Sequence, residues 1–169
     1  MNDLALLVLR LVQGGLLAGH GAQKGFGSFG GPGMAGAAGW LESLGLRPGK
    51  PWAGMAVLVE LGGGLLTLLG LANPLGPVLS ATAMGMAAVT AHQGKPIWVT
   101  AGGAELPAVN ITTAAALVMS GPGRYSLDRL LGIRVPGWIT ALTVLGALVS
   151  LGVGYFSEPE PAEGEPEAA

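Results

Sequence analysis

Seven polar side chains lie within or at the ends of long apolar stretches of this chain, where each could bind a ligand or carry a proton. They are Arg10, Gln13, His20, Lys24, Glu60, His92 and Glu105. Glu60 is the most informative, because it is the one charge in the apolar stretch from Trp52 to Leu71. A carboxylate at that depth in a bilayer is costly and mostly faces a protein interior, a partner or a water-filled cavity. Glu60 therefore marks a candidate functional site.

The polar residues of the first apolar stretch fall on one face of a helix. At 100° per residue, an arc of about 80° contains Arg10, Gln13, Leu17, His20 and Lys24. The rest of that helix surface is almost wholly Leu, Val, Ala and Gly. We expect such a polar stripe to face the interior of a helix bundle.

The remaining candidates are placed by threading the apolar stretches back and forth across a bilayer. We name the side that holds the N-terminus side A and the opposite side side B. Four candidates then lie near side B: His20, Lys24, His92 and Glu105. At 1.5 Å rise per residue, Glu60 lies about 12 Å below side B and Arg10 about 20 Å below it. Long side chains can span much of that difference, so we predict an Arg10–Glu60 ion pair.

Three interpretations of this cluster compete. The first is structural, a buried ion pair that sets the register of the helices. The second is a redox or proton-handling site open to side B, in which His20, Glu60, His92 and Glu105 carry protons and bind a quinone-like ligand. The third is a binding or transport cavity. An arginine at the centre of a span costs about 2.5–3.5 kcal/mol, so the first stretch gains from a partner in each case.

Metal and haem sites have weak support in the sequence. A haem held between His20 and His92 is disfavoured, because two histidines at helix ends are slender evidence for one. A zinc ion would need Glu105 as a further ligand, and we expect no metal. The chain has no cysteine, which excludes disulfides, thiol chemistry and thiolate ligands from this chain alone.

Helices that cross a membrane must position these residues. Half of the residues are hydrophobic and only 11% are charged, against about 25% charged in soluble domains. Five apolar segments of near-spanning length are predicted, at 4–23, 52–72, 75–93, 104–121 and 137–156. Backbone hydrogen bonding in lipid requires helices for such runs. The predicted fold is an all-α polytopic transmembrane bundle of four core helices plus a fifth C-terminal helix, with the lipid bilayer as its first partner.

The segments outside these spans carry weaker signals. Residues 34–45 are predicted to form a short interfacial helix, and tryptophans near segment borders suggest an aromatic belt. Residues 157–169 are predicted to be a disordered acidic tail. Without the five acids of the last twelve residues, the chain has eight basic and five acidic groups, which is not typical of a nucleic-acid-binding protein. Charge counts on the two sides balance and do not give the orientation.

Several short motifs resemble the DoxX family of bacterial membrane proteins in order and spacing. They are Arg10-Leu-Val-Gln-Gly, His20-Gly-Ala-Gln-Lys24-Gly-Phe26-Gly, Phe29-Gly-Gly-Pro-Gly33, Trp40-Leu-Glu42-Ser-Leu-Gly-Leu46, Glu60-Leu-Gly-Gly, His92 and Gly121-Pro-Gly-Arg-Tyr-Ser-Leu-Asp128. The likeness covers about residues 4–131. It implies a four-helix bundle over residues 1–134, with residues 135–156 as an added helix. The resemblance implies that the functional positions of the family correspond in this chain to Arg10, His20, Lys24, Glu42, Glu60 and His92.

The resemblance also implies a place and a role. The family is associated with the bacterial inner membrane and takes its name from a subunit of a thiosulfate:quinone oxidoreductase. We therefore expect a small integral membrane subunit of a quinone-linked redox system, working with a redox partner protein around a polar site at Arg10 and Glu60. The alternative is a non-catalytic scaffold, an assembly factor or a carrier of a small lipophilic solute.

Overall fold

The structure, a computed structural model, describes residues 2–158 as an assembly of helices without strands. The α-helices are α1 (Asp3–Phe26), α2 (Gly33–Ser43), α3 (Gly49–Val57), α4 (Gly63–Leu69), α5 (Leu75–Val89), α6 (Glu105–Ser120), α7 (Leu127–Leu131) and α8 (Gly137–Tyr155). Shorter turns are η1 (Ser28–Gly30), η2 (Leu58–Gly62) and η3 (Val99–Ala101). The predicted all-α bundle is confirmed, and each of the five predicted apolar segments is helical over most of its length.

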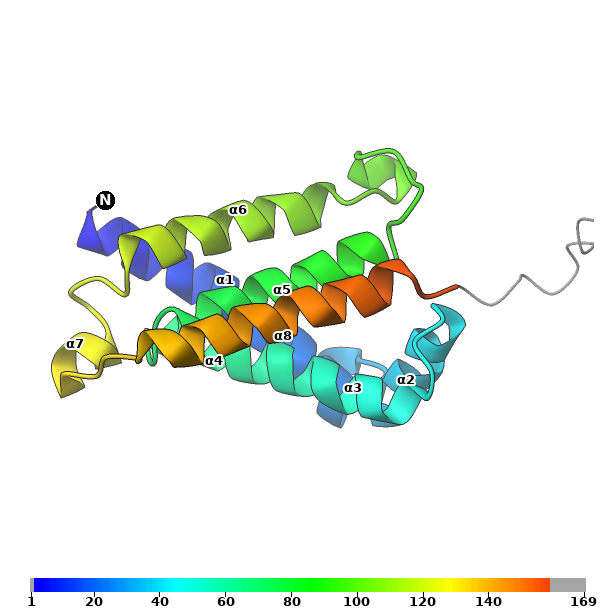
Figure 1. Ribbon diagram of the computed structural model, residues 1–169, viewed down its shortest axis with the longest axis horizontal. Helices are drawn as coiled ribbons and strands as arrows, with labels where there is room; N and C mark the ends of the chain where they lie inside the picture. The colour runs from blue at the N-terminus through cyan, green and yellow to red at the C-terminus, as the bar shows by residue number, and fades with distance from the viewer. Residues whose placement is uncertain (1, 159–169) are drawn as a thin grey trace, which may run out of the picture.

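Consecutive long helices run in opposite directions between two ends of the molecule (Figure 1). The N-terminus and α7 lie at one end, which corresponds to side A. The segment with α2 and the loop between α5 and α6 lie at the other end, which corresponds to side B. The chain therefore passes between the ends five times, in α1, the α3–α4 stretch, α5, α6 and α8.

Three helical stretches are long and apolar enough to cross a membrane. They are Asp3–Phe26, Gly49–Leu69 and Gly137–Tyr155. The helices α5 and α6 are shorter, with 15 and 16 residues. Large apolar side chains cover the outside of α8, including Leu142, Leu145 and Leu148. A lipid environment accounts for this exposure, since lipid tails are as apolar as these side chains.

Glycines allow α1 and α4 to pack closely at the centre of the bundle. A methyl group added at Gly14 would lie 2.5 Å from the backbone nitrogen of Leu68, and one added at Gly64 would meet the backbone of Gly14 and Ala18. Small residues at such crossings bring the two backbones into contact, which is the main source of attraction between helices in lipid.

The helical stretch from Gly49 to Leu69 contains one π-helical turn, η2, at Leu58–Gly62. Glu60 lies in the middle of this turn and is buried. A π-turn adds a residue to the helical repeat and is frequent at functional sites. The helix that carries the unusual carboxylate is thus irregular at that carboxylate, which the sequence analysis did not predict.

The segment between α1 and α3 lies at the side B end of the bundle. The predicted helix at 34–45 is confirmed as α2, and its inner face forms a small core with the start of α3. This core consists of Ala37, Ala38, Leu41, Leu46 and Ala53.

The predicted acidic tail lies outside the described residues from residue 159 onwards. The division at residue 134 into a four-helix domain and an added helix stays a prediction.

Candidate functional site

Lys24 and Glu60 form an ion pair between α1 and η2, in which Glu60 is buried and Lys24 is partly buried. The ammonium nitrogen of Lys24 donates to Oε1 of Glu60 at 2.5 Å and to Oε2 at 2.6 Å. The two side chains are 19% and 9% exposed, respectively. It is the one ion pair that the structure shows for residues 2–158 with both partners described. Charge-assisted bonds of this kind are about twice as strong as neutral ones.

The predicted Arg10–Glu60 pair is wrong, because Glu60 is paired with Lys24. The depth estimate placed Lys24 at the membrane surface and did not allow for the direction of its side chain. Helical side chains lean toward the N-terminus of their helix, so Lys24 reaches from the last turns of α1 back toward side A. Its long stem then brings the ammonium group to the level of Glu60.

Arg10 is instead bound to the loop that follows α6. Its guanidinium donates to the backbone oxygen of Pro122 at 2.8 Å and also to the backbone oxygen of Tyr125. Its side chain lies against Gly70, which ends α4 with a φ of 62°. A side chain at position 70 would meet the guanidinium directly. Arg10 is only 3% exposed, and its charge is used to hold two distant segments together.

Asp128 completes this network at side A. Its carboxylate accepts hydrogen bonds from the backbone nitrogens of Ala72 and Asn73, each at 2.7 Å. These two residues form the tight connection between α4 and α5. Asp128 also interacts electrostatically with Arg10. The structural interpretation of a buried charge cluster therefore describes Arg10 well, although Arg10 donates to backbone oxygens and not to a carboxylate within the described residues.

The other predicted residues are dispersed. Gln13 is buried and donates from Nε2 to the backbone oxygen of Asn110 in α6 at 2.8 Å. His20 is exposed at the edge of the polar stripe of α1. His92 lies in the loop at side B, and Glu105 is the first residue of α6 at the end of that loop. The Nδ1 atom of His92 lies 2.6 Å from the oxygen of Gly102, and Glu105 accepts from the nitrogen of Val99 at 2.9 Å.

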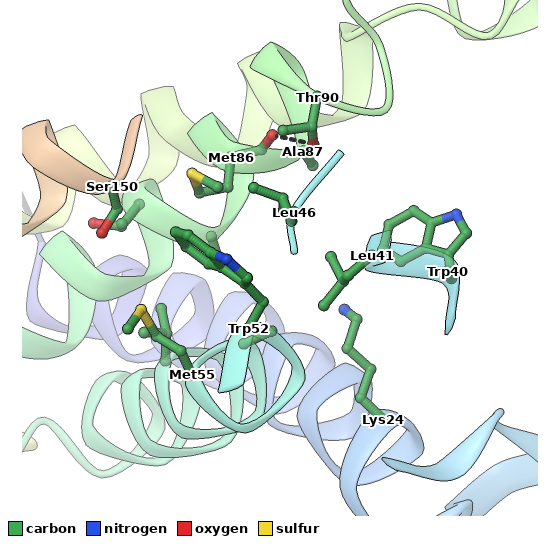
Figure 2. Close-up of a pocket in the computed structure, with 14 residues that line it drawn as sticks. Lys24, Trp40, Leu41, Leu46, Trp52, Met55, Met86, Ala87, Thr90 and Ser150 are labelled. Carbon is green, nitrogen blue, oxygen red and sulfur yellow. Dashed lines mark hydrogen bonds between the residues drawn. The ribbon is translucent and has the colours of Figure 1, made fainter. Parts of the chain in front are cut away.

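An apolar pocket adjoins the Lys24–Glu60 pair (Figure 2). It has a volume of about 80 Å³ and is open on one side. Lys24 is the one charged residue among its lining residues, which come mainly from α1, α2, α3, α5 and α8, with Val59 from η2 and Leu46 from the loop after α2. Its principal side chains are Lys24, Trp40, Trp52, Met55, Thr82 and Met86. Figure 2 shows Trp52 between Met55 and Met86, and the Lys24 amine directed toward Leu41.

The polar groups that line this pocket differ in whether their hydrogen-bond donors are already engaged. The hydroxyl groups of Thr82, Thr90 and Ser150 each donate to a carbonyl oxygen of their own helix. They can still accept a hydrogen bond but not donate a second one. Lys24 has three ammonium hydrogens, and within the described part of the chain only Glu60 accepts from them. The pocket thus offers an apolar, aromatic surface with one remaining charged donor.

Most residues of this pocket were not predicted from the sequence. Trp52 and Met55 are three positions apart and share a helix face, which is a weak signal for a common surface. Their contact with α5 residues such as Met86 could not be predicted, because it depends on how the helices pack. Among residues 2–158, no three His, Asp or Glu side chains gather in a way that could hold a metal ion.

Comparison with known proteins adds one finding. The model of the DoxX family matches residues 5–93, from the start of α1 to just beyond α5. The matched region includes both members of the Lys24–Glu60 pair and most of the pocket. No curated protein and no solved structure matches the chain.

Proposed function

The chain belongs to the DoxX family of membrane proteins, and on that basis we propose that it is a subunit of a quinone-linked redox system. Its pocket beside Trp52 binds the ring of a lipophilic quinone-like carrier, and the Lys24–Glu60 pair makes the polar contact with that ring. The observation that supports this proposal is the charged donor at the wall of an otherwise apolar, tryptophan-lined pocket.

The chemistry of the pocket suits a quinone. A quinone ring is flat and apolar on its faces, and its carbonyl oxygens accept hydrogen bonds but donate none. Trp52 offers a flat surface for the ring, and the third ammonium hydrogen of Lys24 offers a donor to one carbonyl oxygen. The enclosed volume is small, about 80 Å³. Because the pocket is open on one side, the remainder of the carrier extends outward.

The ion pair can also serve proton transfer. Reduction of a quinone to a quinol takes up two electrons and two protons. Lys24 would supply one proton to a carbonyl oxygen of a bound quinone, the second proton would be taken up from water, and the carboxylate of Glu60 would hold the ammonium group in position. The electrons come from a redox partner protein. We place the chain as a multi-pass protein of the bacterial inner membrane, as the family resemblance implies.

Tryptophan fluorescence provides a direct test. The double variant Trp98→Phe/Trp138→Phe removes the two tryptophans outside the pocket and leaves Trp40 and Trp52, which line it. Titration of this variant in detergent with a short-chain benzoquinone should give saturable quenching. Lys24→Met in this background should weaken binding at least about tenfold, since hydrogen bonds to charged groups contribute about 1.5–3 kcal/mol. Lys50→Met is the matched control at an exposed lysine.

A variant that fills the pocket separates a specific site from general partitioning into detergent. Ala83 lines the pocket, so Ala83→Leu should abolish the quenching, whereas Ala141→Leu on the exposed face of α8 should leave it unchanged. Quenching that is linear in quinone concentration and equal in all variants would rule out the proposal.

The alternative function is a carrier or scaffold without catalysis. It is favoured by one observation, namely that Arg10 and Asp128 are bound to backbone groups and hold the helices together. The two functions differ in the fate of a bound quinone. If the variants respond as expected but membranes that contain the protein and its redox partner form no quinol, the chain is a carrier.

A further inference from the structure

A broad polar depression opens at side A, on the face opposite to the proposed quinone pocket. It has a volume of about 840 Å³ and is formed by the loop after α6, by α7 and by the residues before α8. Its polar lining includes three arginines: Arg124, Arg129 and Arg134. All three are exposed. The depression therefore presents a concentration of positive charge at one end of the bundle.

Within the described residues, the two carboxylates of this depression, Asp3 and Asp128, form no ion pair with the arginines. Asp3 accepts a hydrogen bond from the backbone nitrogen of Arg124 at 2.9 Å, and Asp128 accepts from Ala72 and Asn73. Within the described residues, none of the three guanidinium groups forms an ion pair. Their donors remain free to bind an anion from outside the chain.

Apolar side chains beside the arginines place the depression at a membrane surface. Leu130 and Leu131 of α7 are 77% and 60% exposed, although they flank Arg129. Trp138 at the start of α8 is exposed as well. Tryptophan is enriched at the boundary between hydrocarbon and headgroups. Side chains that are apolar on one side and cationic on the other are typical of segments that lie in that boundary.

An apolar groove extends from near the side A ends of α5 and α6 toward the middle of the bundle. It lies over α5 between α6 and α8, has a volume of about 410 Å³ and is lined by Val78, Gly85, Ala115, Met119, Ala147 and Leu151 among others. The groove spans Ile111 to Met119 on α6, a length of about 12 Å. That is most of the ~15 Å of hydrocarbon in one leaflet.

The chain itself joins the depression to the groove. Residues 121–136 connect the end of α6 to the start of α8 (Figure 1). These two helices line the groove. The arginines on this connection therefore lie at the side A end of the groove. The positively charged depression and the side A end of the apolar groove therefore lie at the same end of the bundle, although they share no lining residue.

We propose that this chain binds an anionic phospholipid at side A, with its phosphate on Arg124, Arg129 and Arg134 and one acyl chain in the groove over α5. Guanidinium groups bind phosphate oxygens through paired N–H donors. Basic pockets beside membrane helices are known to bind anionic headgroups. Three unpaired cations favour a headgroup with net negative charge over a zwitterionic one. This proposal does not depend on the proposed quinone site.

Native mass spectrometry of the full chain, released from a neutral detergent, tests the proposal. Phosphatidylglycerol should bind with higher affinity than phosphatidylcholine. Arg129→Gln/Arg134→Gln should weaken phosphatidylglycerol binding about 25-fold, at about fivefold for each cation lost at a membrane surface. Lys50→Gln/Lys95→Gln removes the same charge at side B and should have little effect. Equal losses in the two double variants would show a general charge effect and overturn the assignment.

Two further experiments test whether the acyl chain lies in the groove and whether the bound phosphate belongs to a lipid. Ala115→Phe fills the groove and should weaken phosphatidylglycerol binding, whereas Ala141→Phe on the outer face of α8 should not. Inorganic phosphate at millimolar concentration should not displace the lipid. Displacement by inorganic phosphate, together with indifference to Ala115→Phe, would mean that the arginines bind a free anion and that the lipid assignment is wrong. Thermal unfolding of each variant in phosphatidylcholine checks that the fold is retained.

Discussion

The ammonium nitrogen of Lys24 bridges both carboxylate oxygens of Glu60, at 2.5 and 2.6 Å, inside a bundle of apolar helices. Lys24 comes from the last turns of α1, and Glu60 comes from the π-helical turn η2. The attraction between the two charges offsets most of the desolvation cost of placing each of them away from water. The pair therefore joins the two helices at one depth and also supplies the polar group of the adjacent pocket.

Removal of either partner should destabilise the protein more than removal of both. Lys24→Met or Glu60→Met leaves one buried charge without its partner, which costs about 3–5 kcal/mol. The double variant Lys24→Met/Glu60→Met leaves no buried charge and should recover much of this loss. Unfolding in a denaturing detergent gives the free energies for the double-mutant cycle. Additive losses would show that the two charges are not coupled.

Arg10 should not be replaceable by another cation. Arg10→Lys keeps the charge but loses the planar fork that reaches two carbonyl oxygens at once. We expect a loss of about 1–3 kcal/mol, because at least one buried carbonyl loses its donor. Limited proteolysis of the loop between α6 and α7 should become faster, while Lys95→Gln at side B should leave its rate unchanged. An unaltered cleavage rate in Arg10→Lys would contradict the role given to the guanidinium.

Asp128 should protect the connection between α4 and α5. Asp128→Asn retains the shape but replaces one acceptor oxygen with an NH₂ group, so one of the two backbone amides loses its bond. Hydrogen exchange should then accelerate at Ala72 or Asn73, with a loss of stability of about 1–3 kcal/mol. Amides in the middle of α8, which are remote from this network, serve as the internal reference.

The crossing of α1 and α4 should tolerate no side chain larger than hydrogen. Gly14→Val places its Cβ against the backbone of Leu68, whereas a Cβ at Gly19 meets nothing within 4 Å. Both substitutions introduce the same side chain into the same helix, so Gly19→Val is the matched control. We expect Gly14→Val to lower stability by at least about 1–3 kcal/mol through overpacking. Comparable melting temperatures for the two variants would mean that the helices do not approach as closely as described.

The two histidines should differ in their effects. His92 is bonded to the oxygen of Gly102 and so closes the loop at side B, whereas His20 is exposed on α1. His92→Gln should increase hydrogen exchange in residues 93–104, and His20→Gln should change neither exchange nor quinone quenching. If His20→Gln abolished quinone binding, the pocket described above would not be the binding site.

The extent of the helices followed from the sequence with good accuracy. The segments predicted at 104–121 and 137–156 correspond to α6 at Glu105–Ser120 and α8 at Gly137–Tyr155. Such boundaries are local properties, because apolar runs of spanning length must satisfy their own backbone hydrogen bonds in lipid. The burial of Arg10 and Gln13 was also predictable from the polar stripe of α1. His20, at the edge of that stripe, lies outside the buried face.

The partners of the buried charges did not follow from the sequence. Arg10 is bound to the carbonyl oxygen of Tyr125, which lies 115 positions away. The periodicity of the sequence does not predict such a contact, because the contact depends on how the α6–α7 loop folds back over α4. The pocket beside Trp52 likewise needs side chains from several helices to meet.

By itself, then, the sequence determined which segments become helices, which face of α1 is buried and to which family the chain belongs. Tertiary structure alone decided that Glu60 is paired with Lys24 and that Arg10 is bound to a distant loop. The physical reason is that helix formation in an apolar medium is a local requirement. Pairing of buried charges depends instead on the crossing of α1 and α4, on the π-helical turn at Glu60 and on the direction in which each long side chain leans.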